Sequence, residues 1–145
     1  MERSEQDTEL EAALIEAYRE THYEVEEGSP MTLRVGEPSV ALQQLLRGGG
    51  HRGAAYVTAC NPRSEPLPEV ENAERCAALR EELEARGWSC MAGRGRHPSG
   101  GWDPEASLLV LGIGRREAME IGLRWGQNAV LWAGPDGSPK LILLR

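Results

Sequence analysis

The chain has 145 residues, of which 40% are hydrophobic and 27% charged, so we expect one globular domain over residues 1–145. Its net charge of −7 at pH 7 disfavours general nucleic-acid binding and membrane-surface binding, which require a dense basic face. Three widely spaced cysteines, an acidic N-terminus and the lack of a membrane-length apolar run favour a cytoplasmic protein without a disulfide framework, a metal site or a cofactor.

The N-terminal third predicts helices and short strands that pack onto the rest of the domain. Apolar residues at helical spacing indicate the first helix, and turn residues separate the elements that follow. The expected elements are a helix, two short strands and a second helix, over residues 10–18, 23–26, 31–35 and 38–47. We therefore expect residues 1–50 to surround a core formed by residues 53–145.

The pattern becomes more regular from Gly53 onward. The expected order is strand, helix, strand, strand, helix, strand and strand, over residues 54–59, 69–86, 88–92, 107–113, 114–125, 129–133 and 140–144. A Gly-rich basic loop is expected over 93–101, and the unbroken apolar run of 107–113 is typical of a central strand covered on both faces. This order predicts an α+β, ferredoxin-like (split βαβ) core with an added C-terminal edge strand.

Polar residues stand next to these strands, where a core needs none. In a split βαβ sheet the end of the first strand and the starts of the third and fourth strands meet at one edge. Seven ligand-binding residues are expected to converge there: Asn61, Arg63, Ser64, Asn72, Arg75, Gln127 and Asn128. Guanidinium groups and amides beside a helix N-terminus favour an anion, such as a phosphate, a carboxylate or a nucleotide.

The same residues also have structural explanations. Asn61 stands before a proline, as in many turns. Glu71 and Arg75 have the spacing of an exposed ion pair on a helix. Gln127 and Asn128 follow a helix end, where such residues are common. We expect Arg75 to serve the site rather than to pair with Glu71, but each structural explanation stays open.

Titratable residues at the same edge are candidates for catalysis. The candidates are Glu71, Glu105 and His97, since a histidine beside a carboxylate can act as a general acid or base. Cys60 beside a helix N-terminus is a possible nucleophile, although a buried apolar role is favoured for it. Whether the protein is an enzyme stays open at this point.

Four stretches carry a family resemblance. They are the strand end at 56–64, the pattern Glu71-Asn72-x-x-Arg75, the approach Trp102-x-x-Glu105-x-Ser107, and the segment 126–132. In these stretches, over about residues 56–133, the chain resembles a bacterial family of unknown function, the domain of unknown function numbered 3293. The resemblance implies where a site lies and implies no reaction.

We therefore expect a cytoplasmic recognition module for a small anionic or nucleotide-like ligand, with Arg63 and Arg75 as anion donors and the amides as directional donors. One alternative is a small hydrolase or transferase that acts at the same cleft, for which carboxylates with displaced pKa values would be expected. The other is a protein-interaction domain with structural amides, for which an exposed apolar patch near Trp102 or Trp132 would be expected. A protein partner cannot be named from the sequence.

Overall fold

The computed structural model describes residues 2–145. Its helices are α1 (Ala12–Glu20), α2 (Val40–Gly49), α3 (Glu69–Ala85) and α4 (Arg115–Arg124), with a short 3-10 helix η1 (Pro62–Ser64) before α3. Its strands are β1 (His22–Val25), β2 (Met31–Leu33), β3 (Ala54–Val57), β4 (Ser89–Arg96), β5 (Glu105–Leu111), β6 (Ala129–Ala133) and β7 (Lys140–Leu143). The expected α+β class is therefore confirmed.

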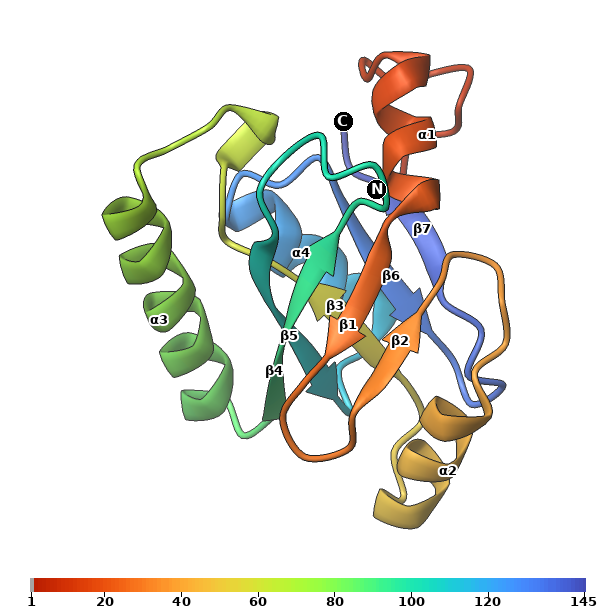
Figure 1. Cartoon of the computed structure of the whole chain (residues 1–145). Coiled ribbons are helices and arrows are strands. Elements are labelled where there is room, and N and C mark those ends of the chain that lie inside the picture. Colours follow the sequence, from red (N-terminus) through yellow and green to blue (C-terminus); the bar gives the residue numbers. More distant parts are fainter. Residues whose placement is uncertain (1) are drawn as a thin grey trace.

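All seven strands belong to one strongly curled antiparallel sheet (Figure 1). The strand order is β2-β1-β4-β5-β3-β6-β7, so β2 and β7 form the two edges. β5 lies in the middle, between β4 and β3, and its Leu109 and Val110 are 1% and 0% exposed. The prediction of a central strand covered on both faces is confirmed.

The N-terminal strands extend this sheet rather than packing onto it. β1 pairs with β4 over His22–Arg96 to Val25–Gly93, and β2 pairs with β1. The expected loop over 93–101 is therefore wrong in its first part, because β4 continues to Arg96. Gly93 allows the pairing, since a Cβ atom there would lie 1.9 Å from the carbonyl oxygen of Glu24.

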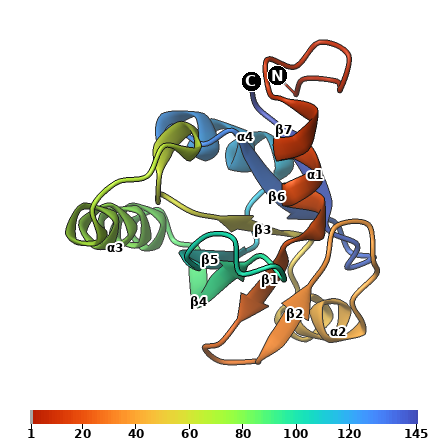
Figure 2. The same cartoon turned by 45° about the horizontal axis from the view of Figure 1, so that its top comes forward.

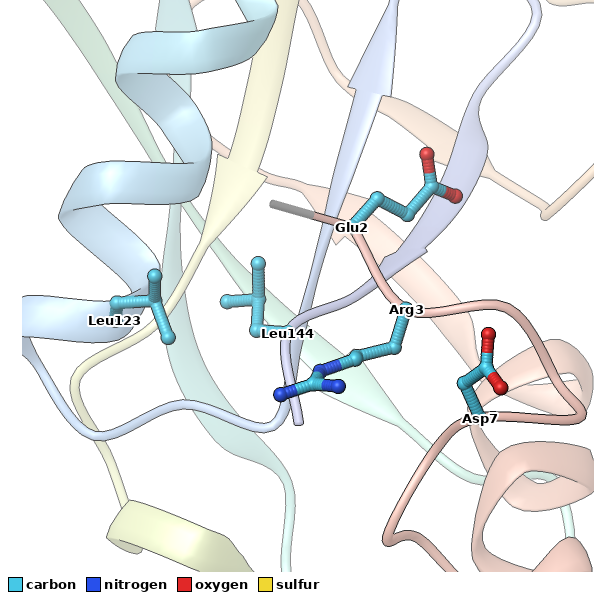
Figure 3. A pocket seen from close by; sticks show the side chains of 5 residues that line it. All are labelled: Glu2, Arg3, Asp7, Leu123 and Leu144. Atoms are coloured by element: carbon cyan, nitrogen blue, oxygen red, sulfur yellow. The ribbon is translucent and has the colours of Figure 1, made fainter.

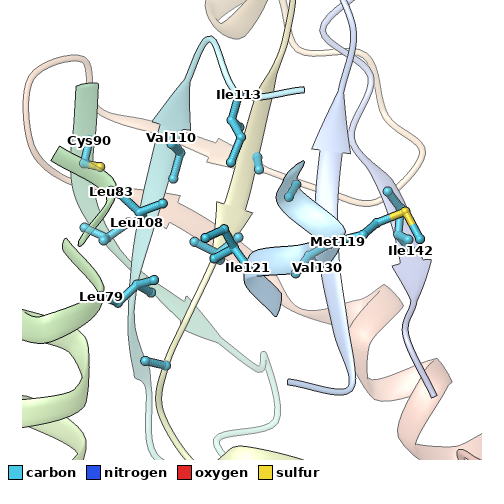
Figure 4. Packing of buried hydrophobic residues seen from close by; sticks show 14 of the residues in the cluster. Leu79, Leu83, Cys90, Leu108, Val110, Ile113, Met119, Ile121, Val130 and Ile142 are labelled. Carbon is cyan, nitrogen blue, oxygen red and sulfur yellow. The ribbon is translucent and has the colours of Figure 1, made fainter. Parts of the chain in front are cut away.

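Helices cover both faces of the sheet. On one face, α3 and α4 pack Leu79, Leu83 and Ile121 against the strands (Figure 4). On the other face, α2 packs Leu42 and Leu46. Full burial of each such side chain stabilises the fold by roughly 1.5–3 kcal/mol. In the part of the chain that the structure describes, none of the helices is long and apolar enough to cross a bilayer.

One end of the sheet collects segments that are distant in sequence. At the top of Figure 1 lie α1, η1 and the β4–β5 loop, and Figure 2 turns this end toward the viewer. β3 ends here, while α3, β5 and β6 begin here, because neighbouring strands of the sheet run in opposite directions. This placement brings polar residues from about half of the chain together.

Substitution of Gly93 by alanine tests the close contact between β1 and β4. We expect Gly93→Ala to lower the free energy of unfolding by at least about 3 kcal/mol, the upper part of the usual range for overpacking. Gly95→Ala in the same strand is the control, since the nearest atom to its added Cβ is 3.7 Å away. Urea denaturation measures both, and equal stabilities of the two variants would contradict the assignment.

Candidate functional site

The chain leaves β3 through a turn with unusual backbone angles. Asn61, Arg63 and Ser64 have φ angles of 45°, 57° and 60°. Asparagine tolerates this left-handed region, whereas other non-glycine residues there cost roughly 1–2 kcal/mol each. Such a turn persists only when the surrounding structure holds it.

Asn61 and Asn72 hold the turn by a reciprocal pair of hydrogen bonds. The backbone N–H of Asn61 donates to Asn72 Oδ1 at 2.9 Å, and Asn72 Nδ2 donates to Asn61 Oδ1 at 2.8 Å. Asn61 Oδ1 also accepts from the backbone N–H of Leu67 at 2.9 Å, and Asn61 Nδ2 donates to Glu105 Oε2 at 2.8 Å. One side chain thus joins the turn, α3 and β5.

Arg75 binds the protein backbone and has no ion pair with Glu71. Its Nε donates to the carbonyl oxygen of Ala59 at 2.6 Å, and its Nη2 donates to that of Trp125 at 2.7 Å. The guanidinium carbon also lies 5.5 Å from the centre of the Trp125 ring. Arg75 is therefore a positioning residue that ties the end of β3 to the end of α4.

Gln127 and the backbone N–H of Arg63 form further hydrogen bonds between the segment after α4 and the turn after β3. Gln127 is buried, and its Nε2 donates to the carbonyl oxygens of Cys60 at 3.1 Å and Trp125 at 3.2 Å. The backbone N–H of Arg63 donates to the carbonyl oxygen of Gly126 at 2.8 Å. Like Asn61 and Arg75, Gln127 uses its side-chain hydrogen bonds to hold the backbone of the turn in place.

Three polar groups meet at this turn, which runs from Asn61 to Ser64 and which we call the braced turn. The hydroxyls of Tyr18 and Ser64 are 2.7 Å apart, and Asn128 Nδ2 donates to each of them at 3.2 Å. Burial raises the pKa of Tyr18, so its hydroxyl stays protonated near neutral pH. Tyr18 is a residue that sequence reasoning missed: on α1 it looked like part of an apolar stripe, and its phenol was the only sign of a polar role.

Arg63 precedes Ser64 on η1 and carries a positive charge. Its side chain belongs to an exposed residue, and within residues 2–145 it takes part in none of the ion pairs. Arg94 and Arg96 on β4 are different, because Arg94 lies 3.3 Å from Glu26 and Arg96 lies 3.2 Å from Glu24 on β1.

The three candidate catalytic residues have different surroundings. Glu105 lies in the network through Asn61, and burial raises the pKa of its carboxyl, partly offset by that hydrogen bond. His97 lies on the β4–β5 loop, 3.4 Å from Glu20, with its ring centre 4.7 Å from that of Trp102. Glu71 is exposed on α3. Of the three, Glu105 is the one joined to the turn.

Two surface hollows are present, and neither is lined by Tyr18, Ser64 or Asn128. The larger, of about 470 Å³, is lined by Glu2, Arg3, Asp7, Leu123 and Leu144 (Figure 3). The smaller, of about 200 Å³, lies between α3 and the β4–β5 pair and includes Cys76 in its wall. Over residues 2–145, no group of three or more His, Cys, Asp or Glu side chains is placed to hold a metal ion.

Replacement of Arg75 by methionine tests its positioning role. Arg75→Met keeps the apolar stem on Trp125 but leaves two carbonyls without a charged donor, so we expect a loss of about 2–4 kcal/mol in unfolding free energy. The matched control is Arg86→Met, because Arg86 stacks on Trp88 at 4.7 Å and forms only a surface pair with Glu82 at 3.9 Å. The control should lose less than about 1 kcal/mol. Similar losses in thermal or urea unfolding would reject the carbonyl bridge as the cause.

The raised pKa of Glu105 predicts a pH-dependent stability. Its neutral form is favoured in the folded state, so the parent protein loses stability as the pH rises through the folded pKa. Glu105→Gln keeps an acceptor for Asn61 and removes this loss. We expect the variant to unfold at a higher temperature than the parent at pH 7, with the difference vanishing below the ordinary glutamate range near about pH 4.3. Glu71→Gln, at an exposed glutamate, is the control. Its unfolding temperature should not rise above that of the parent at pH 7.

The turn and most of its supports lie within the segment that matches a known family. The model of a family described as "Protein of unknown function (DUF3293)" matches residues 57–130, a segment that includes Asn61, Asn72, Arg75 and Asn128 but not Tyr18. Neither a curated protein nor a solved structure gives a significant match. Since the matched segment spans half of the chain, this protein belongs to the DUF3293 family.

Proposed function

We propose that this protein is a cytoplasmic recognition module that binds a small anionic or nucleotide-like ligand at the η1 end of the sheet. The observation that carries the proposal is the meeting of Tyr18, Ser64 and Asn128 at η1, the short helix that also carries the exposed Arg63. The groups come from α1, η1, and the residue before β6, and a braced turn holds them in place. Polar groups held in advance bind a ligand with less loss of entropy than groups on a free loop.

The chemistry of these groups suits one compact anion. Arg63 offers a charged, planar donor for a phosphate or a carboxylate. One of the two hydroxyls keeps a proton to donate, because Tyr18 and Ser64 share one hydrogen bond and the Asn128 amide gives both of its protons to them. A single free guanidinium cannot neutralise a chain of phosphates. The proposal therefore concerns a small molecule and does not extend to general nucleic-acid binding.

Neighbouring carboxylates exclude one of the two possible positions for the anion, the N-terminus of α3. Glu69 and Glu71 occupy the first turn of α3, where they already offset the positive end of the helix dipole. An anion is therefore better placed over η1, next to Arg63, than at the α3 N-terminus. Arg63 and Ser64 would contact the ligand, and the buried Asn128 would orient the Ser64 hydroxyl. The supporting residues are Arg75, Asn61, Asn72 and Gln127.

We also infer a ferredoxin-like (split βαβ) core within the larger sheet. Support comes from the order β3-α3-β4-β5-α4-β6 and from the antiparallel arrangement β4-β5-β3-β6. The packing of α3 and α4 on the same face of the sheet agrees with it. In this description, β1, β2 and β7 are additions to the two sides of the core.

A second candidate function is a small hydrolase or transferase at the same end of the sheet. It is favoured by Glu105, whose buried carboxyl has the raised pKa expected of a general acid. A protein-interaction domain has less support, because the exposed large apolar side chains lie on separate segments. They are Val40 on α2, Val70 on α3, Trp102 on the β4–β5 loop and Leu123 on α4.

Ligand-induced thermal stabilisation tests the proposal. The probes are inorganic phosphate, acetate and adenosine 5′-monophosphate, and an effective one at a hundred times its dissociation constant should add about 2.7 kcal/mol of stability. Arg63→Gln should remove about 1.5–3 kcal/mol of the binding free energy, the usual value of a bond to a charged group. Arg116→Gln, at an exposed arginine on α4, should leave binding unchanged. If no member of a wider panel of metabolite anions stabilises the parent, the proposal fails.

Ser64 offers a sharper variant, because its effect on stability should be small and its effect on binding large. Ser64→Gly relieves the left-handed backbone at φ 60° but removes the hydrogen bonds to Tyr18 and Asn128, so the stability of the free protein should change by less than about 1 kcal/mol. The same change removes the hydroxyl and should weaken ligand binding. A variant of similar stability that binds equally well would exclude Ser64 from the site.

A further inference from the structure

Two thiols meet behind the braced turn. Cys60 follows the end of β3 and Cys76 lies in α3, and their Sγ atoms are 3.0 Å apart. Both Sγ atoms also lie 3.6 Å from the carbonyl oxygen of Ala106 on β5. A disulfide bond of about 2.05 Å therefore requires the two sulfur atoms to approach by about 1 Å, which small side-chain rotations can supply.

The two thiols differ in access to solvent. Cys60 is buried, with 4% of its surface exposed, whereas Cys76 is only half-buried. Cys76 also lines the hollow of about 200 Å³ between α3 and the β4–β5 pair, together with Thr58, Arg80 and Ser107. A small molecule can therefore reach Cys76 first, with Cys60 directly behind it.

The hydrogen bond between the thiols makes their chemistry unequal. The Cys60 thiol and the backbone N–H of Ala59 stabilise the Cys76 thiolate and lower the pKa of Cys76 to about 7. The same hydrogen bond, together with burial, raises the pKa of Cys60. Near neutral pH, Cys76 is thus the nucleophile and Cys60 the proton donor.

We propose that Cys60 and Cys76 form a reversible dithiol–disulfide site that small hydroperoxides oxidise through the hollow beside α3. The Cys76 thiolate attacks a peroxide oxygen, so that an S–O bond forms, the O–O bond breaks, and the leaving oxygen takes a proton to give water or an alcohol. Cys60 then loses its proton to the sulfenic hydroxyl, attacks Cys76 Sγ and releases water. The sulfurs are oxidised and the peroxide is reduced, and a small dithiol reverses the bond by thiol–disulfide exchange.

The disulfide would close a ring over residues 60–76. That ring contains the whole strained turn, the Asn61–Asn72 pair and Arg75. Oxidation would thus tie the end of β3 to α3 by a covalent bond in addition to the hydrogen bonds. The oxidised protein should unfold at a higher denaturant concentration than the reduced one, since a cross-link restricts the unfolded chain.

Treatment of the whole chain with hydrogen peroxide tests the pair. After quenching, we expect the intact mass of the parent to fall by two hydrogen atoms, and alkylation under denaturing conditions should then label one thiol instead of three. Peptide mapping should join Cys60 to Cys76. Cys90 is the internal control, because burial raises its pKa to about 11 and it should stay reduced.

Three single variants separate a paired site from unspecific oxidation. Cys90→Ser should form the disulfide as the parent does. Cys60→Ser should stop at a Cys76 sulfenic acid that a cyclic dione captures, and Cys76→Ser should slow peroxide-driven thiol loss at least about tenfold. Retention of all three thiols in the parent, or direct oxidation of Cys76 to a sulfinic acid while Cys60 stays reduced, would overturn the proposal. Both of these results are measured on the parent protein, so the test remains decisive even if a variant fails to fold.

Discussion

The side chain of Asn61 is the contact on which the end of the sheet depends. It bonds to Asn72 on α3, to the backbone of Leu67 after η1, and to Glu105 on β5. Its own left-handed backbone turns the chain away from β3, a conformation that asparagine tolerates better than most residues. Without that turn, Ser64 would not reach Tyr18 and Asn128.

Most elements could be predicted from the sequence, because hydrophobic periodicity and turn residues mark each of them. The extent of the sheet could not. Gly93 looked like part of a flexible loop, yet it is in β4 because only a residue without a side chain lets β1 approach so closely. Hydrophobic periodicity indicates which face of the sheet a side chain lies on. It does not indicate how closely the backbone of β4 approaches that of β1, a strand about seventy residues earlier in the chain.

For the site, the location of the residues could be predicted from the sequence, but their hydrogen-bond partners could not. Strand direction was enough to predict that Asn61, Asn72, Arg75, Gln127 and Asn128 lie at one end of the sheet, because the antiparallel order fixes which strand ends meet. Their partners could not be predicted. Arg75 and Gln127 bond to backbone carbonyls, which every residue carries and no sequence motif distinguishes. The contact of Cys60 with Cys76 depends in turn on how α3 docks.

The edges of the sheet decide how this protein can meet other chains. An exposed edge strand offers unpaired backbone groups to which another chain can add a strand, a common route to aggregation. Here β2 has only three residues, and β7 has four. The backbone N–H of Arg3 already donates to Leu143 on β7, and Lys140, the only lysine in the chain, is exposed at its start. Both edges of the sheet are thus poor templates for the addition of a strand from another chain.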